Sequence, residues 1–235
     1  MTPAAIVYAP NRPETDPGHA LNLLEGTPLV QHVLQRLRNS NQIDRIVLLA
    51  DENASTDRLA QVAEAMEAGF TITASPSSLR SWVQAAEELG ADQVVPVGAN
   101  LPLIDVELLD ALIKEHQKSR ADYTITSDYV PPGTTAPVMR LEVCRTLSKT
   151  NKPIADPGAL LAALEDPVHA LQAAATRAPW YLRNVNVRLV VETAKDYELL
   201  GMLYGKYLND SGTVALDEVI YFLSQNPGIA GYNLT

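Results

Sequence analysis

Oxygen-bearing side chains stand where several expected strands end, and together they could hold a metal ion. Asn100 follows the run VVPVGA, Asp51 follows IDRIVLLA, and Glu192 follows NVRLVV. Carboxylate and amide oxygens suit Mg²⁺, which usually takes one or two protein carboxylates beside water and phosphate oxygens. Residues far apart in the chain can share one cleft here, because the carboxyl ends of parallel strands meet at one edge of a sheet. Asp105 and Asp196 are further candidates, although each of these acids alone could simply stabilise the first turn of a helix.

The loop after the first expected strand, residues 10–19, is where such folds place a phosphate group. Its sequence is PNRPETDPGH, and its cations are Arg12 and His19. It holds one glycine, Gly18, and matches neither the dinucleotide fingerprint nor the P-loop. A solvated loop without a ligand is the alternative. No His–Cys pair has the spacing of a zinc site, and the single Cys144 is interpreted as a packed hydrophobe.

These residues depend on alternating strands and helices for their position. Apolar runs predict strands at 4–9, 43–50, 70–74, 93–97 and 123–129. Helical spacing predicts helices that open at Thr27-Pro28 and that span 55–68, 77–89 and 105–119. This order is typical of βαβ units, so we expect an α/β fold of three layers, αβα, with a mostly parallel, Rossmann-like mixed sheet.

Beyond residue 129 the pattern is less regular. Strands are expected at 136–141 and 186–191, helices at 144–149, 157–164, from 192 and at 215–225, and a loop at 151–158. We expect one domain over 1–235, with a first half at 1–129 and a second half at 130–235 that extends the same sheet.

Composition excludes several classes of protein. The chain has 235 residues, 46% of them hydrophobic, and a formal net charge of −10. A nucleic-acid surface would need a basic stripe, so no nucleic-acid partner is expected. There is no apolar run of about 18 residues, so no membrane span is expected. The absence of a secretory signal pattern and the single cysteine predict a cytoplasmic protein.

Three stretches resemble a known family. They are AAIVYAPNRPETDPGHALNLLEGTPL near the start, GADQVVPVGANLPLIDVELLDALIKEH in the middle, and RLVVETAKDYELL later in the chain. They are similar to the cytidylyltransferases that activate acidic sugars, above all the spore-coat-polysaccharide type. The acylneuraminate and 3-deoxy-manno-octulosonate enzymes are wider relatives. The Pro17-Gly18 pair, Leu21 and the Gly26-Thr27-Pro28-Leu29 run fall at the family's spacing.

The resemblance implies the nucleotide-diphospho-sugar transferase fold, with 1–129 as the nucleotide-binding half and 130–235 as the acceptor and dimerisation half. It also implies transfer of CMP from CTP to a sugar acid with release of pyrophosphate. It implies Mg²⁺ as cofactor, small-molecule partners of the nucleotide and sugar-acid classes, and a homodimer, to which the stretch TRAPWYLRNV could contribute. The residues it assigns are Arg12 and His19 at the phosphates, Asn100 and Glu192 at the metal, and Ala9, Pro10, Asn11, Asp51 and Ser75 at the nucleotide.

Departures from the family concentrate in these same positions. Pro10 stands where the family has an arginine, His19 where it has a lysine, and Asn100 where it has an aspartate, while Glu14 adds a negative charge. Each lost charge-assisted contact costs about 1.5–3 kcal/mol. We therefore expect weak or altered activity. The alternative is a non-catalytic member of the fold that binds a nucleotide or sugar nucleotide in polysaccharide biosynthesis.

Overall fold

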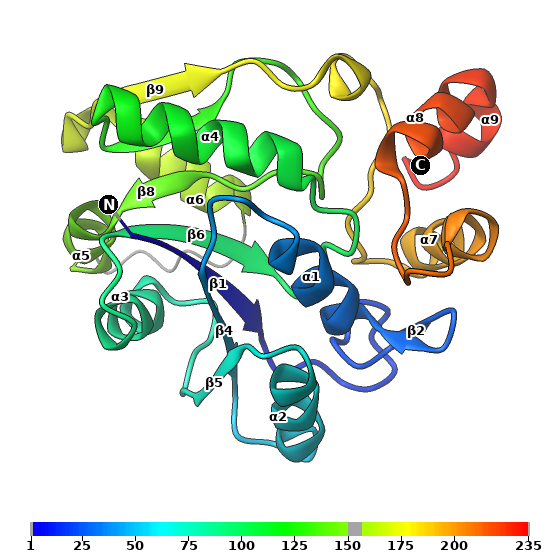
Figure 1. The fold of residues 1–235 in the computed structure, drawn as a ribbon, viewed down its shortest axis with the longest axis horizontal. Coiled ribbons are helices and arrows are strands. Elements are labelled where there is room, and N and C mark those ends of the chain that lie inside the picture. Colours follow the sequence, from blue (N-terminus) through cyan, green and yellow to red (C-terminus); the bar gives the residue numbers. More distant parts are fainter. Residues whose placement is uncertain (1, 150–156, 235) are drawn as a thin grey trace.

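The computed structural model describes residues 2–149 and 157–234, and a seven-stranded mixed sheet forms its centre (Figure 1). The strand order is β5-β4-β1-β6-β8-β7-β9. Strand β8 runs antiparallel to both of its neighbours, and the other pairs are parallel. The bounds are β1 Pro3–Ala9, β4 Arg45–Ala50, β5 Gly69–Ile72, β6 Gln93–Gly98, β7 Tyr123–Thr126, β8 Val138–Arg140 and β9 Ala173–Thr176. A small hairpin, β2 Leu23–Leu24 and β3 Thr27–Pro28, precedes the first helix.

Helices cover both faces of the sheet. One core contains side chains from α1 (Leu29–Arg38), α2 (Thr56–Ala65) and α4 (Val106–Ser119). The opposite core contains side chains from α3 (Leu79–Glu88), α5 (Leu141–Ser148) and α6 (Pro157–Glu165). The C-terminal helices α7 (Ala194–Tyr207), α8 (Leu216–Gln225) and α9 (Pro227–Ala230) lie together beyond the carboxyl end of β6 (Figure 1). These layers confirm the expected three-layer α/β class.

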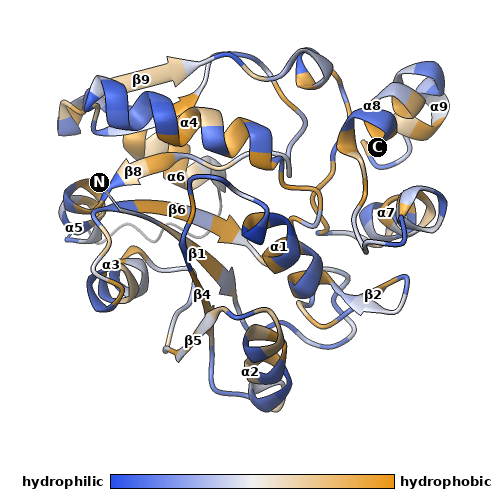
Figure 2. Cartoon of the chain, in the orientation of Figure 1, coloured by the Kyte–Doolittle hydropathy of each residue, from blue (hydrophilic) through white to orange (hydrophobic). Residues whose placement is uncertain are grey.

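Strand β1 shows how the sequence produces the two cores. Ala5 and Val7 point to one core and Ala4 and Ile6 to the other, and all four are fully buried. A parallel strand covered on both faces is apolar at nearly every position rather than at alternate ones. The helices instead carry apolar residues on one side, so their outer faces are hydrophilic (Figure 2).

One strand prediction was wrong, and one strand was not predicted. Residues 186–191 form no strand, because their N–H groups bond to loops: Leu189 donates to the Pro132 carbonyl and Val191 to the Asn100 carbonyl. The seventh strand, β9, comes instead from the run AAAT, which pairs with β7. The helix expected over 55–68 ends at Ala65, before β5. Residues 151–156 of the expected loop lie outside the described residues.

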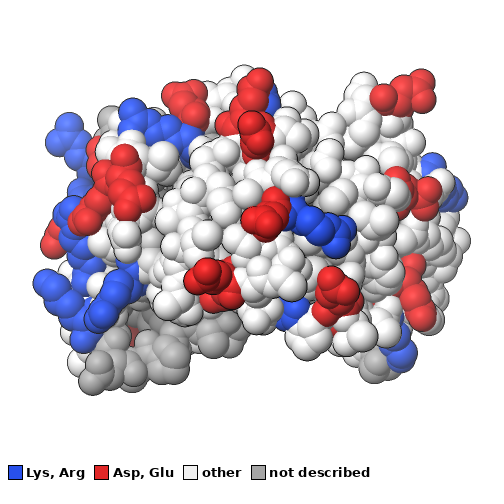
Figure 3. All heavy atoms as spheres, turned by 90° about the horizontal axis from the view of Figure 1, so that it is seen from below, with Lys and Arg blue, Asp and Glu red and all other residues white. Residues whose placement is uncertain are grey.

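Charged side chains are unevenly distributed over the surface. On the face shown in Figure 3, Lys and Arg are most frequent at the left end, whereas Asp and Glu are scattered over the whole face. Among the described helices, none is both long enough and apolar enough to cross a membrane.

Candidate active site

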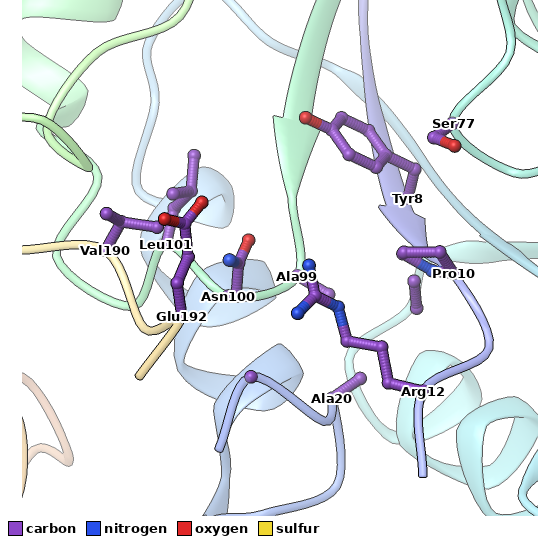
Figure 4. A pocket seen from close by; sticks show the side chains of 12 residues that line it. Tyr8, Pro10, Arg12, Ala20, Ser77, Ala99, Asn100, Leu101, Val190 and Glu192 are labelled. Atoms are coloured by element: carbon purple, nitrogen blue, oxygen red, sulfur yellow. The ribbon is translucent and has the colours of Figure 1, made fainter. Parts of the chain in front are cut away.

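A cleft opens at the carboxyl ends of β1 and β6, and it collects residues from four distant parts of the chain (Figure 4). Its empty volume is ≈ 580 Å³ when the space open to solvent is included. It is lined by Tyr8, Ala9, Pro10, Arg12, Gly18, Ala20, Ser77, Ala99, Asn100, Leu101, Val190 and Glu192.

The loop after β1 is held in shape by two carboxylates. Asp51, at the end of β4, accepts a hydrogen bond of 2.6 Å from the Asn11 N–H. Asp16 accepts one of 2.8 Å from the Gly18 N–H and lies 3.3 Å from the Arg12 guanidinium. The Arg12 side chain points into the cleft (Figure 4). The loop therefore offers one cation to a ligand, and that cation already has an acidic neighbour.

Gly18 lies against the segment that carries Glu192. A Cβ at this position would come within 2.6 Å of the Val191 carbonyl oxygen, closer than real Cβ contacts are found. A glycine is thus required where the β1 loop touches the chain near residue 191.

Asn100 bonds to the residue before Glu192, and both Asn100 and Glu192 line the cleft. The Asn100 amide nitrogen donates to the Val191 carbonyl at 3.0 Å, and the Val191 N–H donates back to the Asn100 carbonyl at 3.0 Å. The Asn100 Oδ1 lies over Gly98, where a Cβ would be only 2.5 Å away. The Glu192 carboxylate is half-exposed in the cleft, 3.7 Å from Arg188. One amide oxygen and one carboxylate thus flank the same space.

His19, expected at the phosphates, is not part of the cleft lining, although its neighbours Gly18 and Ala20 are. Its side chain is buried, with Nδ1 accepting from the Leu21 N–H and Nε2 3.4 Å from the Ser55 hydroxyl. Burial lowers the pKa of His19, although Glu14 opposes this effect. His19 therefore packs beneath the loop as a neutral side chain near pH 7.

The other expected nucleotide residues divide into two groups. Ala9 and Pro10 line the cleft, whereas Asn11, Asp51 and Ser75 do not. Asn11 and Asp51 shape the loop through their mutual hydrogen bond. Ser75 is exposed, and its carbonyl accepts the Ser78 N–H ahead of α3.

Asp105 is the N-cap of α4 and Asp196 lies in the first turn of α7, and both are buried. Asp105 accepts from the Leu108 N–H and from the Tyr181 hydroxyl at 2.8 Å, and burial raises its pKa. Asp196 forms a capping box with Thr193. Burial favours a higher pKa for Asp196, but the hydrogen bonds from Thr193, Arg188 and Glu192 outweigh it and hold the pKa below the ordinary value.

Tyr8 and Ser77 also line the cleft, and neither was named as a site residue from the sequence. The Tyr8 ring packs against Trp82, with ring centroids 5.4 Å apart. Tyr8 lies one residue before the last residue of β1, and Ser77 precedes the N-cap of α3. Their position at the carboxyl edge of the sheet was the available signal.

Comparison with known proteins agrees with this geometry. Residues 17–187 match the cytidylyltransferase family. The spore coat polysaccharide biosynthesis protein SpsF of Bacillus subtilis (strain 168) is 26% identical over 231 residues, which cover 91% of this chain and 90% of that protein.

Two solved structures share the fold. A cytidylyltransferase from Leptospira borgpetersenii serovar Hardjo-bovis (strain JB197) has a TM-score of 0.84 at 18% identity, covering 100% of this chain and 98% of that one. The CMP:2-keto-3-deoxy-manno-octonic acid synthetase complexed with CTP has a TM-score of 0.64 at 13% identity, covering 88% and 99%. The match over most of the chain, on this fold, shows that the protein belongs to the cytidylyltransferase family.

Proposed function

We propose that this protein transfers CMP from CTP to a sugar acid, with release of pyrophosphate, and that its activity is weak. The observation that carries the proposal is the meeting of Arg12, Asn100 and Glu192 in one cleft at the carboxyl ends of β1 and β6. The family relationship supports the nucleotide, and the CTP complex of the octonic acid synthetase supports both CTP and a sugar acid by analogy.

The donor set fits Mg²⁺. The Asn100 Oδ1 and the Glu192 carboxylate are hard oxygen ligands, and this metal needs only one or two carboxylates from the protein. When bound, the ion would supply positive charge to the phosphate oxygens. Among the described residues, no three His, Cys, Asp or Glu side chains form a metal-binding group, so water and phosphate would complete the coordination.

The protein's own residues would position the nucleotide. Arg12 would donate to a phosphate after leaving Asp16, and the backbone of Ala9 and Pro10 would face the nucleoside. Asp51 would act indirectly, because it holds the Asn11 N–H and thereby the loop. His19 and Ser75 have no assigned contact in this arrangement.

A second candidate is a non-catalytic binder of a nucleotide or sugar nucleotide. Arg12 and Glu192 are the charged residues of the cleft lining, so its formal charges, +1 and −1, cancel. His19 adds no cation, because it is buried and its pKa is lowered. A triphosphate with four negative charges gains little binding energy from such a lining. A nucleoside monophosphate or sugar nucleotide carries fewer negative charges, so the missing positive charge costs it less binding energy.

Calorimetric titration with CTP and MgCl₂ separates these functions. We expect Mg²⁺-dependent binding that Glu192→Gln removes and that Glu218→Gln, on the exposed side of α8, leaves unchanged. Pyrophosphate release with CTP and 3-deoxy-manno-octulosonate would then support the transferase. Binding without turnover on any sugar acid of this class would favour the non-catalytic binder, and no heat at millimolar CTP would contradict the transferase.

A cytoplasmic location and a homodimer stay predictions. Trp180, in the stretch expected at a dimer contact, is 78% exposed, whereas Tyr181 is tied to Asp105. Light scattering on the purified chain measures the oligomeric state directly, and Trp180→Ser should shift a dimer toward monomer if this stretch forms the contact.

A further inference from the structure

The last described residues of the chain fold back onto the start of α7. The Asn233 amide nitrogen donates to the Arg188 carbonyl at 2.8 Å and to Asp196 Oδ1 at 2.7 Å. The neighbouring Tyr232 hydroxyl bonds to Glu198, and Lys195 lies 5.9 Å from the Tyr232 ring centroid. Asn233 is 5% exposed, whereas Tyr232 is 44% exposed, so the buried contact is the one made by the amide.

Asp196 connects this contact to the cleft. Its Oδ2 accepts from the Glu192 N–H at 3.1 Å and from the Thr193 N–H at 2.8 Å. Arg188 binds the same carboxylate with two nitrogens, at 2.9 and 2.7 Å. The backbone on both sides of Glu192 is therefore tied to one carboxylate that is fully buried.

Asn233 fixes the orientation of that carboxylate. Its two donor bonds reach Arg188 and Asp196 at once, which closes a ring of contacts around the segment 188–193. The Asn233 Oδ1 is buried and has no hydrogen-bond partner in the described structure. The two bonds from the amide nitrogen therefore hold the Asn233 side chain in this orientation, although its Oδ1 forms no hydrogen bond there.

We propose that Asn233 is a positioning residue, which sets the geometry of Glu192 in the cleft through Asp196 and Arg188. The inference rests on the proposed function insofar as Glu192 holds the metal. Residues that orient metal ligands typically change metal affinity by about 10–100-fold when they are replaced. The C-terminal tail, about forty residues after Glu192, would in this way belong to the active site without touching a ligand.

The test variant is Asn233→Asp, which keeps the shape of the side chain but places a second carboxylate against Asp196. The matched control is Tyr232→Phe, which removes only the bond from the same tail to the exposed Glu198. Mn²⁺ serves as the probe, and its affinity in the presence of CTP is measured by electron paramagnetic resonance. Hydrogen exchange of a peptide covering 188–193 reports the loop without any ligand.

We expect Asn233→Asp to bind Mn²⁺ at least about tenfold more weakly and to exchange faster over 188–193. Tyr232→Phe should match the wild-type chain in both measurements. A lower melting temperature with unchanged Mn²⁺ affinity would show a merely structural role and would overturn the inference.

Glu192→Gln distinguishes the inference from the proposed function. If Glu192→Gln weakens Mn²⁺ binding, Asn233→Asp must both weaken Mn²⁺ binding and speed exchange over 188–193. The absence of either effect then overturns the inference. If Glu192→Gln leaves Mn²⁺ affinity unchanged, the proposed metal site is wrong. The positioning role of Asn233 is then tested by hydrogen exchange over 188–193 alone. Faster exchange in Asn233→Asp but not in Tyr232→Phe would still support the positioning role, whereas equal exchange would refute it.

Discussion

Replacing Asn100 by Asp would restore the carboxylate of the family pattern, but the Asn100 amide donates a hydrogen bond that a carboxylate cannot donate. The Asn100 amide nitrogen donates to the Val191 carbonyl at 3.0 Å. An ionised Asp has no donor, so one of its oxygens would face the carbonyl oxygen. A buried acceptor left without its partner costs about 1–3 kcal/mol. We therefore expect Asn100→Asp to be less stable than the wild-type chain by about this amount when no divalent cation is present.

Mg²⁺ should reverse the loss. An added carboxylate beside Glu192 gives the ion a second charged ligand, and a ligand at 100 times its Kd stabilises a folded protein by about 2.7 kcal/mol. Urea unfolding of Asn100→Asp should thus move to higher denaturant concentration when MgCl₂ replaces EDTA. For a chain of this length, each 1 kcal/mol also corresponds to about 2–4 °C in melting temperature.

Asn100→Ala is the control for the hydrogen bond. It loses the same donor without gaining a charge, so its stability should fall in EDTA and stay low in MgCl₂. The reasoning would be refuted if Asn100→Asp were as stable as the wild-type chain in EDTA. It would also be refuted if MgCl₂ stabilised both variants equally, since the metal would then not bind at residue 100.

Three further predictions concern other contacts. Gly18→Ala should lower the free energy of unfolding by about 1–3 kcal/mol in urea titrations, because its Cβ would meet the Val191 carbonyl at 2.6 Å. Burial and Arg140 lower the pKa of His116 to about 4, so its neutral form stabilises the fold fully above pH 6.5. That stability, about 3 kcal/mol, should be lost between pH 6.5 and 4, and His116→Asn should flatten the profile. Burial raises the pKa of Cys144 to about 12, so a thiol reagent at pH 8 should label it only after unfolding.

Most of the scaffold could be predicted because burial leaves a clear pattern in the sequence. Leu29, Val33, Leu34 and Leu37 recur at helical spacing, and all four are fully buried in α1. The strands at the centre of the sheet are likewise continuous apolar runs, and the seven-residue β1 is the best example. Such elements are specified by the contact that each face makes with a core.

Strand β9 and the segment 186–191 could not be predicted, because their state depends on partners rather than on composition. Alanine is a weak strand former, yet Ala173 to Ala175 pair with β7 in register. The run NVRLVV is rich in valine, but the N–H groups of Leu189 and Val191 bond to two separate loops. Local strand propensity therefore predicts neither the pairing of β9 nor the absence of a strand at 186–191.

The candidate site was predictable to the level of the sheet edge and no further. The rule that ligands bind at the carboxyl ends of strands correctly brought Arg12, Asn100 and Glu192 together. It could not predict the direction of side chains inside a loop. His19 turns under the loop toward Ser55, because the chain reverses at Asp16 and Gly18.

The departures from the family pattern are built into the packing of this protein, and this bears on the ligand. The Asn100 amide bonds to Val191, and His19 is buried against Ser55. A substitution that fitted poorly would leave an unpaired polar group or a cavity, whereas each of these side chains has a hydrogen-bonding partner. Because the same changes remove charge from the cleft, a ligand with fewer phosphate charges than CTP would lose the least affinity. A titration series with CMP, CTP and a CMP-sugar, each with and without Mg²⁺, measures that difference in affinity directly. Equal affinities without metal favour a monophosphate site. A strong preference for CTP with Mg²⁺ favours the transferase.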